Sequence, residues 1–358
     1  MRWPTNWDRL RFFLWPVAML YHALVWWRNL YYRVGFFVSK RVPVPVVSVG
    51  NLTVGGTGKT PAVIFLAKHL RQMGYRPGIL SRGYGRKSSG TVMVSDGVNI
   101  LATYPQSGDE PALMAQRLRE VPVVVDENRY RGAEALISQA HPDVIILDDG
   151  FQHRGLAREC DLVLMDAGML PRDYHMFPFG RLREPISAIK RSRAVIWTRT
   201  QRYKRPDAVA KKVSRMGLPE IASSMSTEPE LIDLATGGRV ASSTLKGREI
   251  VAFCGLAQPR QFYHSLRDVG IEPDRVRYFH DHHDYSPADF KELSQLLSRA
   301  DGVMITTEKD AVKLPGEFLD SQAVYALRIN FEIVGAELEK LTALLLDCLP
   351  APSASAEA

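Results

Sequence analysis

Short apolar runs alternate along much of the chain with longer stretches in which apolar residues recur at helical spacing. Apolar runs of about four to eight residues that alternate with helices are typical of a parallel sheet with helices on both faces. The pattern therefore predicts a first α/β domain over residues 42–220. Its expected strands lie at 42–49, 78–80, 121–125, 144–147, 162–165 and 194–197.

A second, shorter alternation predicts a smaller α/β domain over residues 250–350. Before it, strand-like segments flank Gly237 and Gly238, and a Gly-Gly pair between strands is typical of a β-hairpin. Residues 221–249 are therefore expected to form a hairpin linker. The tail 351–358 has low complexity and is expected to be disordered. The strands expected in this half lie at 250–254, 275–279, 303–306 and 325–329, with helices up to 269 and at 287–298.

Residues 1–41 differ from the rest in charge and in aromatic content. The chain has 358 residues and a formal net charge of +7, and this segment holds seven basic residues against Asp8 alone. It also holds five of the six tryptophans. Aromatic rings interleaved with arginine suit the headgroup layer of a bilayer that contains anionic lipids. We expect the segment to associate with a membrane surface; the alternative is a helix that packs its aromatic side chains on the protein's own core.

The apolar run at residues 12–27 is too short for a membrane span. Its 16 residues are interrupted by Pro16 and His22, whereas a span needs about 20 apolar residues. No small-residue cleavage site follows, so a signal peptide fits poorly. A peripheral or monotopic location is predicted. A nucleic-acid partner is not, because the rest of the chain adds no basic stripe to this segment.

Three scattered cysteines, Cys160, Cys254 and Cys348, indicate a reducing compartment. Their odd number and their spacing make neither a disulfide framework nor a spaced metal cluster. A zinc site is therefore not predicted.

A glycine-rich segment with the features of a phosphate-binding loop follows the first expected strand. Its glycines let the backbone curl so that several N–H groups face one anion, and the N-terminus of the helix that follows adds partial positive charge. Lys59 is expected to reach the β- and γ-phosphates, and Thr60 to ligate Mg²⁺. The strict motif has glycine at the position of Thr53. The expected ATP-binding residues are Thr53, Val54, Gly55, Gly56, Thr57, Gly58, Lys59 and Thr60.

Two adjacent aspartates, Asp148 and Asp149, follow the apolar run at 144–147. Ligands bind at the carboxyl ends of the strands in open α/β sheets, and a P-loop enzyme needs a carboxylate for its metal. At least one of the two is therefore expected to hold Mg²⁺. Paired carboxylates at a strand end can also cap a helix or lie at the surface.

Further motifs follow one another along the chain, and the full series lies at 50–61, 81–87, 108–111, 126–131, 148–153, 180–185, 279–285 and 305–313. This series, together with the basic aromatic segment, closely resembles the tetraacyldisaccharide 4′-kinases, the lipid A kinases of the Gram-negative inner membrane. The resemblance runs from about residue 42 to residue 313. It implies a P-loop NTPase-like fold and transfer of the ATP γ-phosphate to the 4′-hydroxyl of a tetraacylated glucosamine disaccharide 1-phosphate. The product would be lipid IVA, formed at the cytoplasmic face of the inner membrane, with no obligate protein partner.

The resemblance also implies a catalytic pair. Asp109 corresponds to the family's base, and His282 to the histidine that pairs with it; His280 and His283 are the alternatives. A carboxylate bonded to imidazole can hold the ring's tautomer and tune the base. Asp109 can also be read as an N-cap of the helix near Pro111. Because the pair spans the two predicted domains, we expect these domains to close on ATP and lipid.

Arginines suit a phosphate that develops charge during transfer, because one guanidinium can bind it through two donors. Arg129 and Arg183 match the family motifs by position, and Glu184 is a candidate metal partner; each can also be a structural salt bridge. The segment 307–310 is a candidate nucleobase contact. It lacks the Asn-Lys-x-Asp spacing that reads guanine, so ATP is expected rather than GTP.

Two other classes of protein stay open at this point. A membrane-bound P-loop switch ATPase of the partitioning or division-site type would share the loop and the membrane. Such proteins carry lysine before the Gly-Gly pair, where this chain has Val54, and they dimerise face to face on ATP, which a second domain would obstruct. The other class is a membrane adaptor that binds ATP without chemistry; it would stay active in an Asp109→Ala variant.

Overall fold

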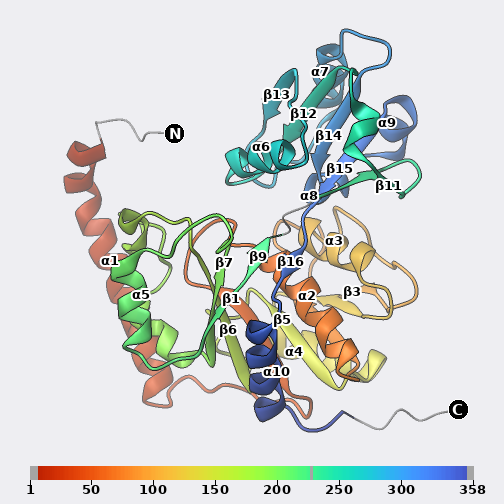
Figure 1. Ribbon diagram of the computed structural model, residues 1–358. Coiled ribbons are helices and arrows are strands. Elements are labelled where there is room, and N and C mark those ends of the chain that lie inside the picture. The colour runs from red at the N-terminus through yellow and green to blue at the C-terminus, as the bar shows by residue number, and fades with distance from the viewer. Residues whose placement is uncertain (1–6, 226–228, 353–358) are drawn as a thin grey trace, which may run out of the picture. The chain divides into compact units, whose positions relative to one another are not determined.

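The computed structural model describes residues 7–225 and 229–352, with side chains from residue 14 onward. The described residues fall into two compact units. The first unit draws on residues 1–59, 144–224 and 333–358, and the second on residues 60–143 and 225–332. Each unit contains parallel strands and helices, as the predicted α/β class requires (Figure 1).

The first unit is built on five parallel strands in the order β5-β1-β6-β7-β8. All residues of the four strands β5, β1, β6 and β7 are buried, which agrees with the mainly apolar sequence of these segments. Val49 of β1 pairs with Asp148 of β5. The carboxyl ends of these two strands therefore lie side by side. The strands are β1 (Val46–Asn51), β5 (Val144–Asp148), β6 (Cys160–Asp166), β7 (Ala194–Thr198) and β8 (Glu220–Ala222).

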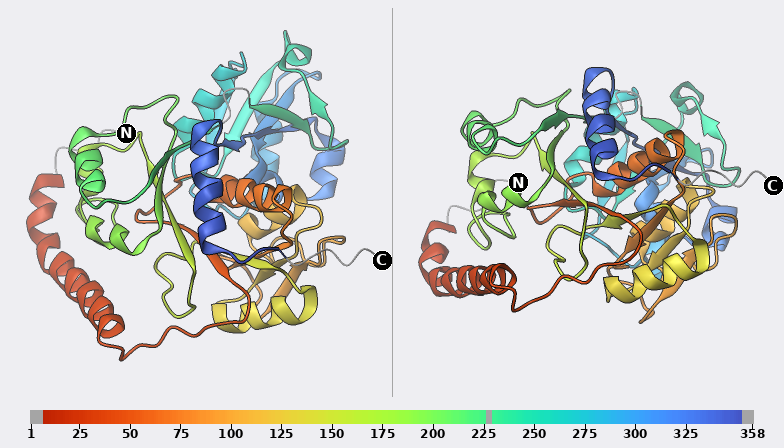
Figure 2. Two further views of the ribbon diagram at one scale, coloured as in Figure 1. Left: turned by 60° about the horizontal axis from the view of Figure 1, so that its bottom comes forward. Right: turned by 90° about the horizontal axis from the view of Figure 1, so that it is seen from below.

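Helices and 3-10 turns pack around these strands. A core cluster that includes Phe151 and Trp197 lies on one face of the sheet. The long helix α1 lies at the outer edge of the unit, in red in Figure 2. Within the described part of the chain, no helix combines the length and the hydropathy that a membrane crossing requires. The helical elements are α1 (Trp7–Arg33), η1 (Pro171–Tyr174), η2 (Ile186–Arg191), α5 (Asp207–Ser214) and α10 (Ala336–Cys348).

The second unit contains two sets of strands. In the first set, β2 (Pro77–Ser81) is parallel to β4 (Val123–Val125), and β3 (Val92–Ser95) is antiparallel to β4. Asn128 caps α4 by accepting from the backbone N–H groups of Tyr130 and Arg131. The helices of this part are α2 (Lys59–Gln72, whose first residue belongs to the first unit), α3 (Asp109–Arg117) and α4 (Arg129–Ala140).

The second set is a six-stranded sheet in the order β11-β10-β15-β14-β12-β13. Alternate residues of β12 enter two different cores: Ala252 and Cys254 lie in one, and Val251 and Phe253 in the other. Both faces of this sheet are therefore covered. Its strands are β10 (Glu230–Asp233), β11 (Arg239–Val240), β12 (Ile250–Cys254), β13 (Arg275–Tyr278), β14 (Val303–Thr307) and β15 (Val324–Arg328). The helical elements of this part are η3 (Ser242–Leu245), α6 (Pro259–Asp268), α7 (Pro287–Leu296), α8 (Glu308–Ala311) and α9 (Gly316–Ser321). Two further short strands, β9 (Ser224–Met225) and β16 (Phe331–Glu332), are not part of this sheet.

The predicted strands are confirmed at every predicted position, with boundaries shifted by a few residues. The hairpin around Gly237 is also confirmed, because Leu231 pairs with Val240. This hairpin is the edge of the six-stranded sheet, since β10 also pairs with β15. The strands β3 and β8 and the two-residue strands β9 and β16 were not predicted. Of the tail expected to be disordered, only residues 351 and 352 lie within the described part of the chain.

Candidate active site

The loop between β1 and α2 has the backbone conformation that a phosphate-binding loop needs. Gly55 and Gly58 have φ values of 98° and 85°, in the left-handed region that side chains rarely adopt. Asn51 Nδ2 donates to Thr57 Oγ1 at 2.8 Å, which ties the root of the loop to its middle. The loop then leads directly into the first turn of α2, where Thr60 follows Lys59 and is buried.

Two cations converge on Asp149 at the end of β5. Lys59 Nζ lies 3.4 Å from one carboxylate oxygen, and Arg183 Nη1 lies 3.0 Å from the other. Burial alone would raise the pKa of Asp149, but Lys59 and Arg183 together hold it below its ordinary value. The structure therefore brings together an ionised carboxylate and two of the predicted phosphate ligands.

Two further arginines, which the sequence did not single out, hold the carbonyl groups of the loop. Arg181 Nη2 donates to the carbonyl of Val54 at 2.8 Å. Arg199 Nη2 donates to the carbonyl of Gly56 at 3.4 Å, while its Nη1 pairs with buried Asp166. Arg181 lies within the motif at 180–185 and could have been found there. Arg199 has a φ of 63°, a conformation that no sequence motif signals.

The residues predicted to hold Mg²⁺ are chemically suited to it. Mg²⁺ prefers oxygen ligands and is usually bound by one or two carboxylates together with substrate phosphates and water. Asp148 and Asp149 supply carboxylates at a strand end, and Thr60 supplies a hydroxyl next to Lys59. Among the described side chains, no group of three or more His, Cys, Asp or Glu residues could hold a metal by protein ligands alone. The set therefore fits an ion that a triphosphate brings with it.

Glu184, predicted as a further metal partner, makes different contacts. Its side chain is fully buried and pairs with Arg28 of α1 and Arg191 of η2, each at 3.0 Å, and it also accepts from Asn29. These contacts match the structural salt bridge that the sequence left open as the alternative, and the metal role of Glu184 stays a prediction. The neighbouring backbone contributes as well, since Tyr21 Oη donates to the carbonyl of Arg183 at 2.7 Å. Glu184 therefore anchors α1.

In the second unit, Asp109 and His282 form the predicted pair. His282 Nδ1 lies 2.9 Å from Asp109 Oδ2. The N-cap of α3 is Gly108, and Asp109 Oδ1 accepts only the N–H of Glu110 among the contacts in the structure, so Asp109 does not cap the helix. His280 and His283 contact one another, and His283 also contacts Asp289. Of the three candidate histidines, His282 is the partner of Asp109.

Two lysines from the segment 307–313 surround this pair. Lys309 Nζ lies 3.1 Å from His282 Nε2, and Lys313 Nζ lies 3.3 Å from Asp109 Oδ2. Burial would raise the pKa of Asp109, but the His282 hydrogen bond and the two lysines lower it to about 2. Asp109 is therefore an ionised carboxylate at neutral pH. The segment 307–310 was predicted as a nucleobase contact, and this stays a prediction; Lys309 from this segment contacts His282, and Lys313 beyond it contacts Asp109.

Arg129 lies at the first position of α4 and is buried. Its Nη1 donates to the backbone carbonyls of Asp126 and Glu127. The Nη1 group of Arg129 therefore stabilises the loop that precedes α4.

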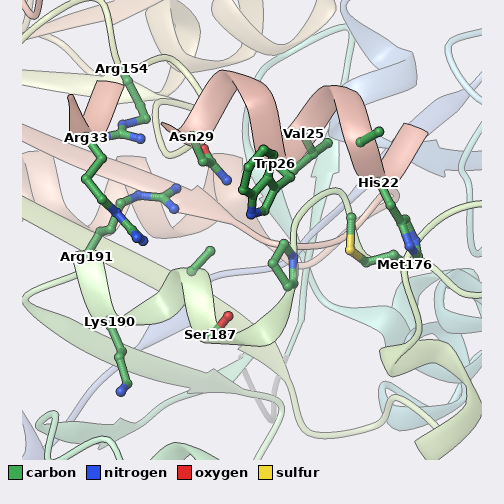
Figure 3. A pocket seen from close by; sticks show the side chains of 13 residues that line it. His22, Val25, Trp26, Asn29, Arg33, Arg154, Met176, Ser187, Lys190 and Arg191 are labelled. Carbon is green, nitrogen blue, oxygen red and sulfur yellow. The ribbon is translucent and has the colours of Figure 1, made fainter. Parts of the chain in front are cut away.

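A cavity of about 840 Å³ lies in the first unit between α1 and η2 (Figure 3). Four of its lining side chains are basic, and several others are apolar, so it offers positive charge beside a hydrophobic wall. Trp15, Leu20 and Trp26 of α1 are between 58% and 62% exposed, so α1 does not pack all its apolar residues on the protein. The lining residues are His22, Ala23, Val25, Trp26, Asn29, Arg33, Arg154, Met176, Pro185, Ser187, Ala188, Lys190 and Arg191.

Comparisons with known proteins identify relatives of this chain. A curated tetraacyldisaccharide 4′-kinase from Aquifex aeolicus is 38% identical over 336 residues, which cover 94% of this chain and 98% of the relative. A second, from Chlorobium luteolum, is 38% identical and covers 86% and 88%. The solved structure of LpxK from Aquifex aeolicus in complex with ATP is 36% identical, with a TM-score of 0.77, and covers 95% of this chain and 100% of that one.

The family model described as tetraacyldisaccharide-1-P 4′-kinase matches residues 10–349, nearly the whole chain. The matched range contains the segments of the phosphate-binding loop, the strand-end aspartates, Asp109 and His282. The chain belongs to the tetraacyldisaccharide-1-P 4′-kinase family.

Proposed function

We propose that this protein transfers the γ-phosphate of ATP to the 4′-hydroxyl of a tetraacylated glucosamine disaccharide 1-phosphate, which gives lipid IVA in lipid A biosynthesis. The observation that carries this proposal is the family match over residues 10–349. The loop that ends in Lys59 and the Asp109–His282 pair supply the two parts that a phosphoryl transfer to an alcohol needs.

The phosphate-binding loop and its neighbours bind the triphosphate. The N–H groups of residues 53–58 and the N-terminus of α2 face the phosphates, and Lys59 and Arg183 neutralise the charge that develops during transfer. Thr60 and at least one of Asp148 and Asp149 hold Mg²⁺, which offsets phosphate charge when it is bound. Arg181 and Arg199 keep the loop in shape through its carbonyls.

Asp109 is the base of the proposed reaction. As the sugar oxygen forms its bond to phosphorus, the proton of the 4′-hydroxyl passes to an Asp109 oxygen and the bond from the γ-phosphorus to ADP breaks. The hydrogen bond from His282 fixes the carboxylate. A low pKa suffices for this task because the transition state of phosphoryl transfer is loose and asks for little proton transfer. Arg129 contributes, on this proposal, to charge stabilisation.

The cavity beside α1 is the proposed entry site for the lipid substrate. Arg33, Arg154, Lys190 and Arg191 provide cationic donors for a phosphorylated headgroup. The exposed apolar side chains of α1 lie, on this proposal, in the surface of an anionic membrane, with basic residues at the headgroup level. The protein would then be a peripheral protein of the cytoplasmic face of the inner membrane.

The test is a transfer assay with purified protein, Mg²⁺, γ-labelled ATP, detergent and a tetraacylated disaccharide 1-phosphate. Label should move to the lipid in the native protein and not in Asp109→Asn, while Asp320→Asn, an exposed carboxylate on α9, serves as the matched control. ATP hydrolysis that needs only membrane and yields no labelled lipid would favour a switch ATPase instead. ATP binding without any turnover would favour the adaptor.

A further inference from the structure

His282 is held from both sides of its imidazole ring. Its Nδ1 lies 2.9 Å from Asp109 Oδ2, and its Nε2 lies 3.1 Å from Lys309 Nζ. Lys309 sits at the start of α8, directly after the parallel strand β14. His282 itself has a φ of 56°, a strained conformation that persists only where neighbouring groups hold it.

The chemistry of the two partners decides where the ring carries its proton. A lysine ammonium has three donors and no acceptor, so a hydrogen bond to it requires a lone pair on Nε2. An ionised carboxylate has only acceptors, so a hydrogen bond to it requires a proton on Nδ1. Burial lowers the pKa of Lys309, but Glu110, Asp109 and Asp281 more than offset this and keep the ammonium charged. Both partners therefore demand the same neutral tautomer.

We propose that Lys309 is a positioning residue that holds His282 as the neutral Nδ1–H tautomer and thereby fixes its hydrogen bond to Asp109. This inference rests on the proposed function for its catalytic meaning. In the absence of Lys309, Nε2 would be open to a proton, and an Nε2–H ring cannot donate to Asp109 through Nδ1. The carboxylate would then lose the bond that orients it.

The surroundings of the ring support this assignment. Lys313 is buried and contacts Asp109 Oδ2 and the carbonyl of His283, so it lies beside the carboxylate rather than at Nε2. Asp281 is 4.0 Å from Nε2 and has no proton to donate when ionised. The Tyr84 ring meets the imidazole edge to face at 5.1 Å between centroids. Lys309 is the hydrogen-bond donor that the structure places at Nε2.

The first test reads the tautomer directly. Nitrogen NMR of the full-length protein labelled with ¹⁵N-histidine distinguishes Nδ1–H, Nε2–H and protonated rings, and a His282→Gln variant assigns the signal among the nine histidines. In the native protein we expect His282 to carry its proton on Nδ1. In Lys309→Met we expect that the ring is no longer held in the Nδ1–H form alone. An Nε2–H or protonated ring in the native protein, or an unchanged ring in Lys309→Met, would overturn the proposal.

The second test separates positioning from nucleotide binding. In Lys309→Met, kcat should fall by about 10- to 100-fold, as expected when a reacting group is misplaced, and the KM for ATP should stay unchanged. Lys309→Arg should recover part of the loss, since a guanidinium can also donate to Nε2. Lys291→Met removes an exposed lysine of α7 as the control, and melting temperatures check folding.

A rise in KM for ATP at constant kcat would instead make Lys309 a nucleotide ligand, and would refute the positioning role. If the native protein transfers no phosphate to the disaccharide lipid, the proposed function fails. The NMR measurement still decides the position of the proton on His282, so the two failures are distinguishable.

Discussion

Lys59 Nζ lies 3.4 Å from Asp149 Oδ1, so the lysine of the phosphate-binding loop and a strand-end carboxylate form an ion pair in the first unit. The pairing follows from the sheet, because β1 and β5 are adjacent and in register at Val49 and Asp148. Arg183 contacts the same carboxylate from a distant segment. Asp149 therefore balances two cations that are suited to bind phosphate.

Replacing Asp149 by Asn should reduce kcat by about 10²-fold, the usual cost of losing one preorganised charge partner. The Mg²⁺ concentration needed for half-maximal activity should rise, because one oxygen ligand becomes neutral. Steady-state kinetics over a range of Mg²⁺ concentrations measure both effects, with Asp320→Asn as the control. A normal Mg²⁺ requirement in Asp149→Asn would assign the metal to Asp148 alone.

The low pKa of Asp109 predicts a stability that depends on pH. Its folded-state pKa is about 2, against an ordinary value of 3.8. A carboxyl group with a lowered folded-state pKa adds stability that is complete above the unfolded value and is lost as pH falls through the folded value. The shift corresponds to a contribution on the order of 2 kcal/mol.

Urea unfolding of the native protein and of Asp109→Asn should therefore show the largest difference in unfolding free energy near neutral pH. The difference should shrink below about pH 4, where the unfolded carboxyl becomes protonated. A difference that stays constant down to about pH 3 would mean that the charge of Asp109 does not stabilise the fold.

Replacing Arg199 by Met should weaken ATP binding and destabilise the first unit. The change removes the donor to the Gly56 carbonyl and leaves buried Asp166 without its guanidinium partner. Breaking such a pair costs about 3 to 5 kcal/mol. Thermal unfolding and the KM for ATP measure the two consequences, and Arg215→Met, at an exposed position after α5, is the control. An unchanged KM for ATP would show that the loop keeps its shape without this arginine.

Replacing Glu184 by Ala should lower stability and leave the Mg²⁺ requirement unchanged. The variant leaves Arg28 and Arg191 without the buried carboxylate that holds them, and the expected loss is about 3 kcal/mol. Differential scanning calorimetry and Mg²⁺ titration of the activity give the two readouts. A shifted Mg²⁺ requirement with normal stability would restore Glu184 as a metal partner.

Replacing the exposed residues Trp15, Leu20 and Trp26 by Ser should weaken binding to vesicles that contain anionic lipid. Each large apolar side chain contributes about 1.5 to 3 kcal/mol when it is fully buried, so even partial insertion of three predicts at least about a tenfold loss. Val98→Ser and Val334→Ser, at positions 86% and 71% exposed outside α1, form the control. Equal binding of the two variants in vesicle sedimentation would remove α1 from the membrane contact.

The strands and the phosphate loop could be predicted because their signals are local. A continuous apolar run identifies a strand buried on both faces, and glycine spacing identifies the loop. The strand β3 was missed because only two of its four residues are buried, and its pairing with β4 depends on an irregular register after Met93. The short strand β8 has only three residues and a single buried position.

The site residues could be predicted only where a motif carries them. Asp109 and His282 were identified through family motifs, although 173 positions separate them. Arg199 and Lys309 act through contacts across the fold, with a backbone carbonyl and with an imidazole nitrogen, and no spacing rule predicts either contact. For Glu184 the sequence left a metal contact and a salt bridge open, and its pairing with Arg28 of α1 is a contact across the fold that no spacing rule predicts.

Arg183 and Glu184 contact two separate parts of the first unit, the helix α1 and the carboxyl end of β5. In α1, Tyr21 donates a hydrogen bond to the carbonyl of Arg183, and Arg28 forms an ion pair with Glu184. The guanidinium of Arg183 forms an ion pair with Asp149. Under the proposed function, a lipid layer that shifts α1 would therefore be expected to disturb the ion pair of Arg183 with Asp149, so membrane contact and nucleotide binding would be coupled.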